Sequence, residues 1–155
     1  MCRFLTAMMA FICIVPAAHA KEFPPVYVVA EIMPNEATSC GYSHDSIAAT
    51  VKSELRHNRI EIATMEDYPL NAILGFIITN ADYRADFGLC AVRFDFSFWT
   101  MESITLSPTK EKRVEQVVFC ERGGLITGKA KDVQKELNNN FRDYTSQCIF
   151  EYLGE

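Results

Sequence analysis

The chain has 155 residues, of which 49% are apolar and 23% charged, and its formal net charge at pH 7 is −5. This composition is too apolar for a disordered chain and too evenly mixed for a protein with many membrane spans. An acidic chain without a basic cluster binds nucleic acid poorly, because contacts to phosphate supply most of that affinity. We therefore expect a globular protein with no nucleic-acid partner.

The N-terminal segment has the pattern of a cleaved secretory signal. Arg3 supplies a short basic region, and the apolar stretch Leu5 to Val15 that follows is too short to span a bilayer. Ala18-His19-Ala20 then places small residues where a signal peptidase requires them. We expect residues 1–20 to be removed, so that the mature chain starts at Lys21, has no membrane anchor and is periplasmic or secreted.

Four cysteines remain after this cleavage: Cys40, Cys90, Cys120 and Cys148. In an oxidising compartment they form up to two disulfides, and they are spaced too widely for a zinc knuckle. Geometry favours Cys120–Cys148, because both lie about 26–27 Å from the expected turn between the last strand and the last helix. Cys40 and Cys90 then pair by exclusion. A hairpin at 121–124 would make Cys40–Cys148 or Cys90–Cys120 equally good pairs.

The expected elements follow from the period of the apolar residues, which is about 3.6 in a helix and 2 in a strand. A helix begins at Ser43 or Asp45, which can cap it, and the second helix is weak at Asn138–Asn140. Gly75 marks a bulge or close approach in its strand, and 121–124 a bulge or tight turn. The elements are strands at 26–32, 59–64, 70–80, 89–101 and 114–120, the last followed by 125–127 beyond the bulge or turn, and helices at about 43–57 and 131–152.

The strand at 89–101 has the clearest alternation. One face carries the apolar side chains Cys90, Val92, Phe94, Phe96 and Phe98, and the other carries Arg93, Asp95 and Ser97. Phenylalanines on one face are typical of a sheet that lies on helices. We therefore expect a single α+β domain at 21–155, a two-layer sandwich of order β-α-β-β-β-β-α. Its sheet is mostly antiparallel, and both helices cover one sheet face.

Residue types used in catalysis occur, but not in catalytic patterns. Ser43-His44-Asp45 are consecutive, so their side chains diverge and suit a helix cap better than a relay. His44 and His57 lie about 20 Å apart along one helix and cannot share a metal ion. The glycines before Lys129 lack the hydroxyl residue of a phosphate loop. We therefore expect no catalytic residue, no metal site and no cofactor.

Trp99 is the strongest functional signal in the sequence. By alternation it lies with Arg93 and Asp95, away from the phenylalanines. One interpretation is an edge-of-core ring packed over Arg93. The other is a contact anchor on an open sheet face, because binding hot spots favour Trp, Tyr and Arg. Tyr27 and Tyr83 would extend such a contact surface.

Three functions are compatible with these features. The first is a non-catalytic envelope protein that binds a protein or glycan partner through the open sheet face, with contacts at Trp99, Arg93, Asp95 and Tyr27. The second is a secreted inhibitor or immunity protein, whose acidic surface covers a basic envelope enzyme. The third is a small periplasmic hydrolase, for which the sequence supplies no matched acid–base pair.

Overall fold

The computed structural model describes residues 22–31, 39–66, 72–84 and 87–154, so the expected signal peptide lies outside the described residues. The elements are β1 (Val26–Glu31), α1 (His44–His57), β2 (Ile73–Arg84), β3 (Leu89–Leu106), β4 (Glu111–Lys129) and α2 (Ala130–Leu153). They follow the expected order, although the segment 59–64 contributes only an isolated parallel bridge between Val26 and Ile62.

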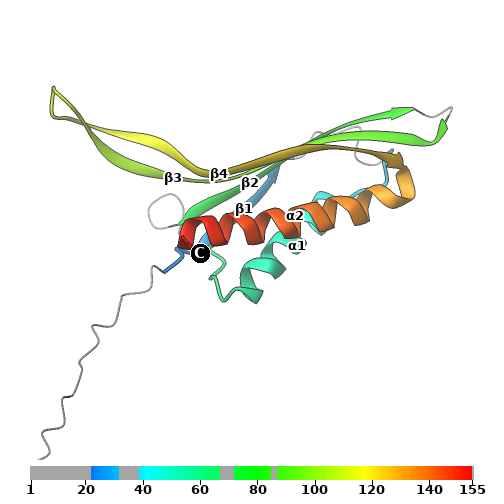
Figure 1. Cartoon of the computed structure of the whole chain (residues 1–155), viewed down its shortest axis with the longest axis horizontal. Helices are drawn as coiled ribbons and strands as arrows, with labels where there is room; N and C mark the ends of the chain where they lie inside the picture. Colours follow the sequence, from blue (N-terminus) through cyan, green and yellow to red (C-terminus); the bar gives the residue numbers. More distant parts are fainter. Residues whose placement is uncertain (1–21, 32–38, 67–71, 85–86, 155) are drawn as a thin grey trace, which may run out of the picture.

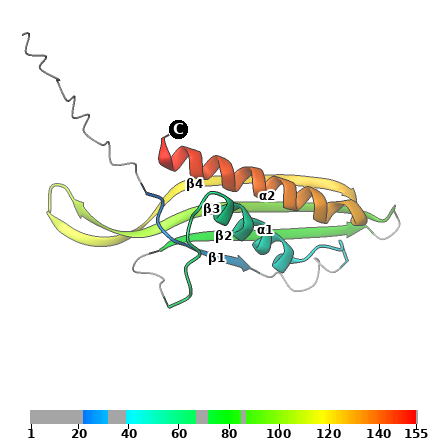
Figure 2. The same ribbon diagram turned by 90° about the horizontal axis from the view of Figure 1, so that it is seen from below.

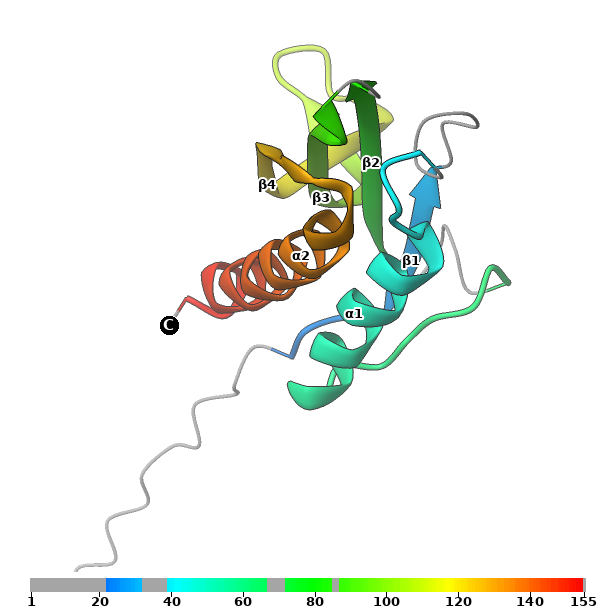
Figure 3. The same cartoon turned by 90° about the vertical axis from the view of Figure 1, so that its right-hand side faces the viewer.

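The sheet has four strands in the order β1-β2-β3-β4. β1 runs parallel to β2, and the other two pairs are antiparallel. Both helices lie on the same face of this sheet (Figure 1). α1 packs against β1, and α2 packs against β3 and β4 (Figure 3). The expected two-layer α+β sandwich with a mostly antiparallel sheet is confirmed.

The core lies between the sheet and the helices, and the side chains on the helix-facing side of β3 fill much of it. Phe94, Phe96 and Phe98 are 2%, 1% and 0% exposed. The ring centroid of Phe141 on α2 lies 5.3 Å from that of Phe94 and 5.9 Å from that of Phe96. A Cβ atom on Gly75 would lie 2.9 Å from the Phe98 ring, so this glycine permits the close approach that its position in the strand suggests.

The two helices form where the apolar stripes predict them. The Ser43 side chain accepts a hydrogen bond from the Ser46 N–H and so caps α1. α2 continues without a break through Asn138–Asn140, contrary to the weakness expected there. The Asn138 side chain accepts from Gln134 at 2.8 Å and donates to the Ser46 hydroxyl of α1 at 3.3 Å. Because these bonds use the side-chain amide of Asn138, it does not compete for the hydrogen bonds of the helix backbone.

β4 is one strand with a bulge, and the bulge is not where the glycines suggest. Phe98 pairs with Cys120 while Trp99 pairs with Val118, so Phe119 is the extra residue. The expected bulge or turn at 121–124 is wrong, since these residues pair with β3 in regular register. Gly124 instead leaves room for a ring, because a Cβ atom there would lie 2.9 Å from Phe94.

Two disulfides join distant parts of the chain. Cys40 is bonded to Cys90 and Cys120 to Cys148, with Cα–Cα distances of 5.6 Å and 5.5 Å. Both pairs are those that the sequence predicts. The first joins the segment before α1 to β3, and the second joins β4 to α2 across the two layers.

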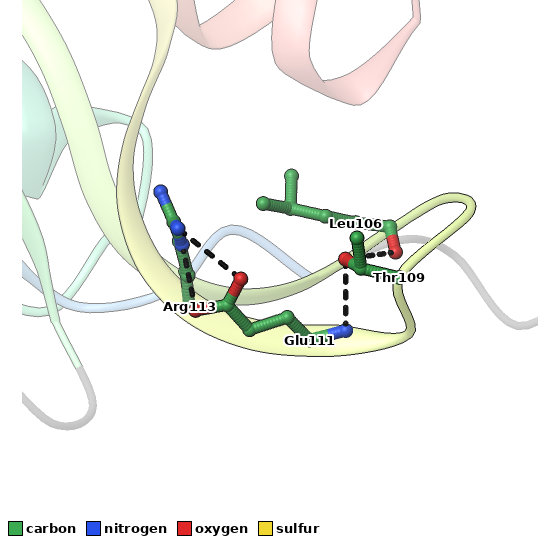
Figure 4. A network of polar contacts seen from close by, with 4 residues as sticks. All are labelled: Leu106, Thr109, Glu111 and Arg113. Atoms are coloured by element: carbon green, nitrogen blue, oxygen red, sulfur yellow. Dashed lines mark hydrogen bonds and ion pairs between the residues drawn. The ribbon is translucent and has the colours of Figure 1, made fainter.

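β3 and β4 extend well beyond the helices as a two-stranded hairpin (Figures 1 and 2). We call residues 101–116 the arm; they include the paired ends of the two strands and the turn between them. At its tip, Thr109 Oγ1 accepts a hydrogen bond from the Glu111 N–H at 3.4 Å (Figure 4). The Lys110 N–H donates to the Leu106 carbonyl at 2.8 Å, which closes the turn.

Candidate functional site

The sheet face opposite the helices, which we call the open face, carries one large side chain from each strand in a single row. Tyr27 of β1 pairs with Leu74 of β2, Leu74 with Trp99 of β3, and Trp99 with Val118 of β4. Directly paired residues share a face of a sheet, so the four side chains form one continuous line. We call these four residues the central row.

Two further rows extend the open face toward the end of β1. One contains Val29, Phe76, Ser97 and Glu121, and the next contains Glu31, Ile78, Asp95 and Gly123. Val29, Phe76 and Ile78 are half-buried and continue the apolar surface over β1 and β2. The three carboxylates Glu31, Asp95 and Glu121 lie at its border. The open face is therefore apolar at its centre and acidic along one side.

The size of this surface follows from sheet geometry. Three rows span about 13 Å along the strands, and four strands span about 14 Å across them. A standard protein–protein interface removes about 800 Å² per partner from solvent, so these rows suit the centre of such an interface rather than its whole area.

The predicted contact residues share the open face but do not form one cluster. Trp99 and Tyr27 belong to the central row, whereas Arg93 and Asp95 lie farther along β3 and form an ion pair at 3.4 Å. Arg93 is six residues from Trp99, about 20 Å along the strand. The interpretation in which the Trp99 ring packs over Arg93 is therefore wrong. Leu74 and Val118 flank the indole instead.

Tyr83 does not extend the open face. It pairs with Cys90, and Cys90 belongs to the helix-facing side of β3. The expectation that Tyr83 adds to the contact surface is therefore wrong, since the alternation along β2 puts it on the opposite face from Leu74 and Phe76.

Sequence reasoning missed Leu74, Phe76 and Val118 as members of the open face. The apolar run at 70–80 predicts apolar side chains on both faces of that strand. Leu74 and Phe76 are among the apolar residues of this run on the face opposite the helices. Strict alternation would place Val118 on the same face as Cys120, which faces the helices. The bulge at Phe119 adds one residue between them, so Val118 lies on the open face instead.

His44 belongs to a buried polar cluster on the helix-facing side of the sheet. Its Nε2 lies 2.6 Å from Thr79 Oγ1, which also accepts a hydrogen bond from the Tyr42 hydroxyl at 3.2 Å. Burial lowers the pKa of His44, and the nearby Asp45 carboxylate opposes part of that shift. A neutral His44 accepting from Thr79 holds the start of α1 against β2, while the Ser43 hydroxyl caps the helix.

Other features of the described residues point to no second site. Within these residues there is no group of three or more His, Cys, Asp or Glu side chains placed to hold a metal ion. A hollow of about 650 Å³ lies where the N-terminal segment meets the ends of both helices, and Phe23, Arg59 and Leu153 are among the residues that line it. Neither helix of the described chain has both the length and the apolar character needed to cross a membrane.

The open face is thus the surface on which the predicted contact residues Trp99 and Tyr27 lie together with further apolar side chains. Compared with models of known protein families, the chain matches none, and no curated protein sequence matches it either.

Proposed function

We propose that the chain is an exported, non-catalytic protein that binds a protein partner through the open face, with Trp99 at the centre of the contact. The observation that carries this proposal is the central row, which brings Tyr27, Leu74, Trp99 and Val118 into one line; Leu74 is only 6% exposed, so Tyr27, Trp99 and Val118 supply its accessible surface. Interfaces typically have an apolar, aromatic centre and a polar border, and Trp and Tyr dominate their hot spots.

The compartment in this proposal is the periplasm or the exterior of the cell. Two disulfides are typical of an oxidising environment, because the cytosol of most cells keeps thiols reduced. The apolar stretch and the Ala18-His19-Ala20 site at the start of the chain agree with export.

A protein partner fits the open face better than a glycan. The two side chains directly opposite Trp99 on the neighbouring strands, Leu74 and Val118, are aliphatic. Aliphatic groups supply no hydrogen bonds to sugar hydroxyls, whereas apolar side chains of a protein bury well against them.

The acidic border favours a narrower version, in which the partner is a basic enzyme that the chain inhibits. Glu31, Asp95 and Glu121 lie beside the apolar centre, and because Arg93 in the next row pairs with Asp95 at 3.4 Å, Glu31 and Glu121 supply the negative charge of this border. Such a border steers a positively charged partner toward the open face.

Photo-crosslinking locates the contact. A photoreactive phenylalanine at Phe76 places the probe on the open face, and one at Phe150 places it on α2, where Phe150 is 46% exposed. In cells that express the exported protein, the probe at Phe76 should give a discrete adduct with a partner, and the probe at Phe150 should not. Equal labelling from both positions would contradict the proposal.

Trp99→Ala tests the centre of the contact quantitatively. It should weaken binding to the crosslinked partner by about 2 kcal/mol or more, roughly thirtyfold, with little change in the melting temperature. Phe87→Ala removes an aromatic ring that is 70% exposed and lies outside the open face, and it should leave affinity unchanged. A large fall in the melting temperature of Trp99→Ala would assign Trp99 to stability. Turnover of a cell-wall substrate that Asp95→Asn abolishes would replace the proposal with a hydrolase.

A further inference from the structure

The arm presents a free strand edge on β4. β4 is the last strand in the sheet order, and residues 111–116 of it are all exposed. Within the described chain no strand pairs with this edge, so its backbone N–H and C=O groups form a template for another strand. A two-stranded hairpin without a covering layer is also only marginally stable, so this edge gains from a partner.

One pair of like charges on the arm is placed so that another strand can neutralise it. Glu102 of β3 pairs directly with Glu115 of β4, and like charges in directly opposed positions destabilise a sheet. Arg113 lies on the same face of β4, two residues from Glu115, but its guanidinium contacts Glu111 at 3.1 Å. The pair Glu102 and Glu115 therefore faces no cation from its own two strands at that position.

We propose that two copies of the chain associate through their arms, with β4 of one copy antiparallel to β4 of the other and a two-fold axis at Val114. In this register Arg113 lies opposite Glu115 of the second copy, and Glu115 lies opposite its Arg113. Each guanidinium then lies beside the Glu102–Glu115 pair of the other copy. Val114, which is 63% exposed in the single chain, meets its own symmetry mate.

The sequence of β4 selects this register over its neighbours. A two-fold axis at Arg113 would oppose the two Arg113 side chains, and it would oppose Glu111 to Glu115. An axis at Glu115 would oppose the two Glu115 side chains. Both arrangements place like charges in directly opposed positions. The axis at Val114 also leaves Lys112 opposite an uncharged Gln116, and the pairing closes with two copies because the contact is isologous.

Disulfide trapping tests the register. In the proposed pairing, Val114→Cys brings two thiols together across the axis, at the Cα separation of about 4.5–5.5 Å that a disulfide requires. Lys112→Cys, on the same face of the same strand, places its two thiols about 13 Å apart along the strands. Under mild oxidation of the purified protein, the first variant should give a covalent dimer and the second should remain monomeric. Equal dimer yields from both variants would overturn the register.

Charge reversal tests the source of the affinity in the protein without added cysteines. Sedimentation velocity should show a concentration-dependent dimer for the wild type. Arg113→Glu or Glu115→Arg should each weaken it about tenfold or more, because each opposes like charges across the axis. The double variant Arg113→Glu/Glu115→Arg should restore it, since the two positions still face each other with opposite charge. A wild type that stays monomeric at every concentration, or a double variant that remains as weak as the single ones, would refute the proposal.

Discussion

At the scale of single residues, the stability of the fold depends on the phenylalanines of β3. The Phe96 ring lies 4.8 Å from Phe98 and 5.9 Å from Phe141, measured between centroids. Phe96→Ala should lower the free energy of unfolding by about 3–5 kcal/mol, because it removes buried surface and leaves a cavity. Urea denaturation measures this change. Leu125→Ala, at a side chain that is 66% exposed on the open face, is the control and should change it by less than about 0.5 kcal/mol.

His44 should make stability depend on pH. Burial lowers its pKa in the folded protein below the ordinary value of 6.5, despite the opposing effect of Asp45. Between these two pKa values the unfolded chain binds more protons than the folded one, so the free energy of unfolding decreases as the pH falls through 6.5. This loss stops once the pH is below the pKa of the folded state.

The variant His44→Gln isolates this effect from the titration of other groups. It keeps a polar side chain near Thr79 but cannot be protonated. The difference in unfolding free energy between wild type and variant should therefore become less favourable to the wild type as the pH falls below 6.5. Chemical denaturation at a series of pH values gives this difference, and a value that does not vary with pH would contradict the assignment.

At the scale of elements, the Cys120–Cys148 disulfide fixes α2 on β4. The two cysteines are 28 residues apart in the sequence, and a loop of that length predicts a stabilisation of about 3–4 kcal/mol through the unfolded state. The double variant Cys120→Ala/Cys148→Ala should lose that amount in urea denaturation under oxidising conditions. Cys40→Ala/Cys90→Ala, with a separation of 50, should lose about 4 kcal/mol by the same argument. A variant that unfolds like the wild type would show that its bond contributes nothing.

The elements also show what local patterns can predict. The alternation of 89–101 identified the buried face of β3, because burial on one side of a sheet requires a period of two. Strand and helix rises were enough to pair Cys120 with Cys148. The bulge at Phe119 had no local signal, and the glycines at 123 and 124 suggested a wrong position for it. A Cβ atom on Gly123 or Gly124 would clash with the Asp95 or Phe94 side chain of the neighbouring strand, and this contact is known only once the strand pairing is known.

At the scale of the whole molecule, the expected cleavage of residues 1–20 defines the mature chain. We expect the mature protein to begin at Lys21, because Ala18-His19-Ala20 places small residues at the cleavage position. Mass spectrometry of the protein recovered from the periplasm or the medium checks this. An intact Met1, or a retained apolar segment 5–15, would contradict the expectation and leave the chain attached to its signal.

The sequence by itself determined the layers of this protein: which face of β3 is buried, where the helices begin and end to within a few residues, and that Cys120 and Cys148 lie at the same level of the two layers. These properties follow from the periods of helix and strand and from their rise per residue. Only the tertiary structure decided that β1 runs parallel to β2, which places Tyr27 and Leu74 in one row with Trp99. Only the tertiary structure also showed the length of the arm and the bulge at Phe119 that places Val118 on the open face. Strand partners and register depend on contacts between segments distant in the chain, and no local period encodes them.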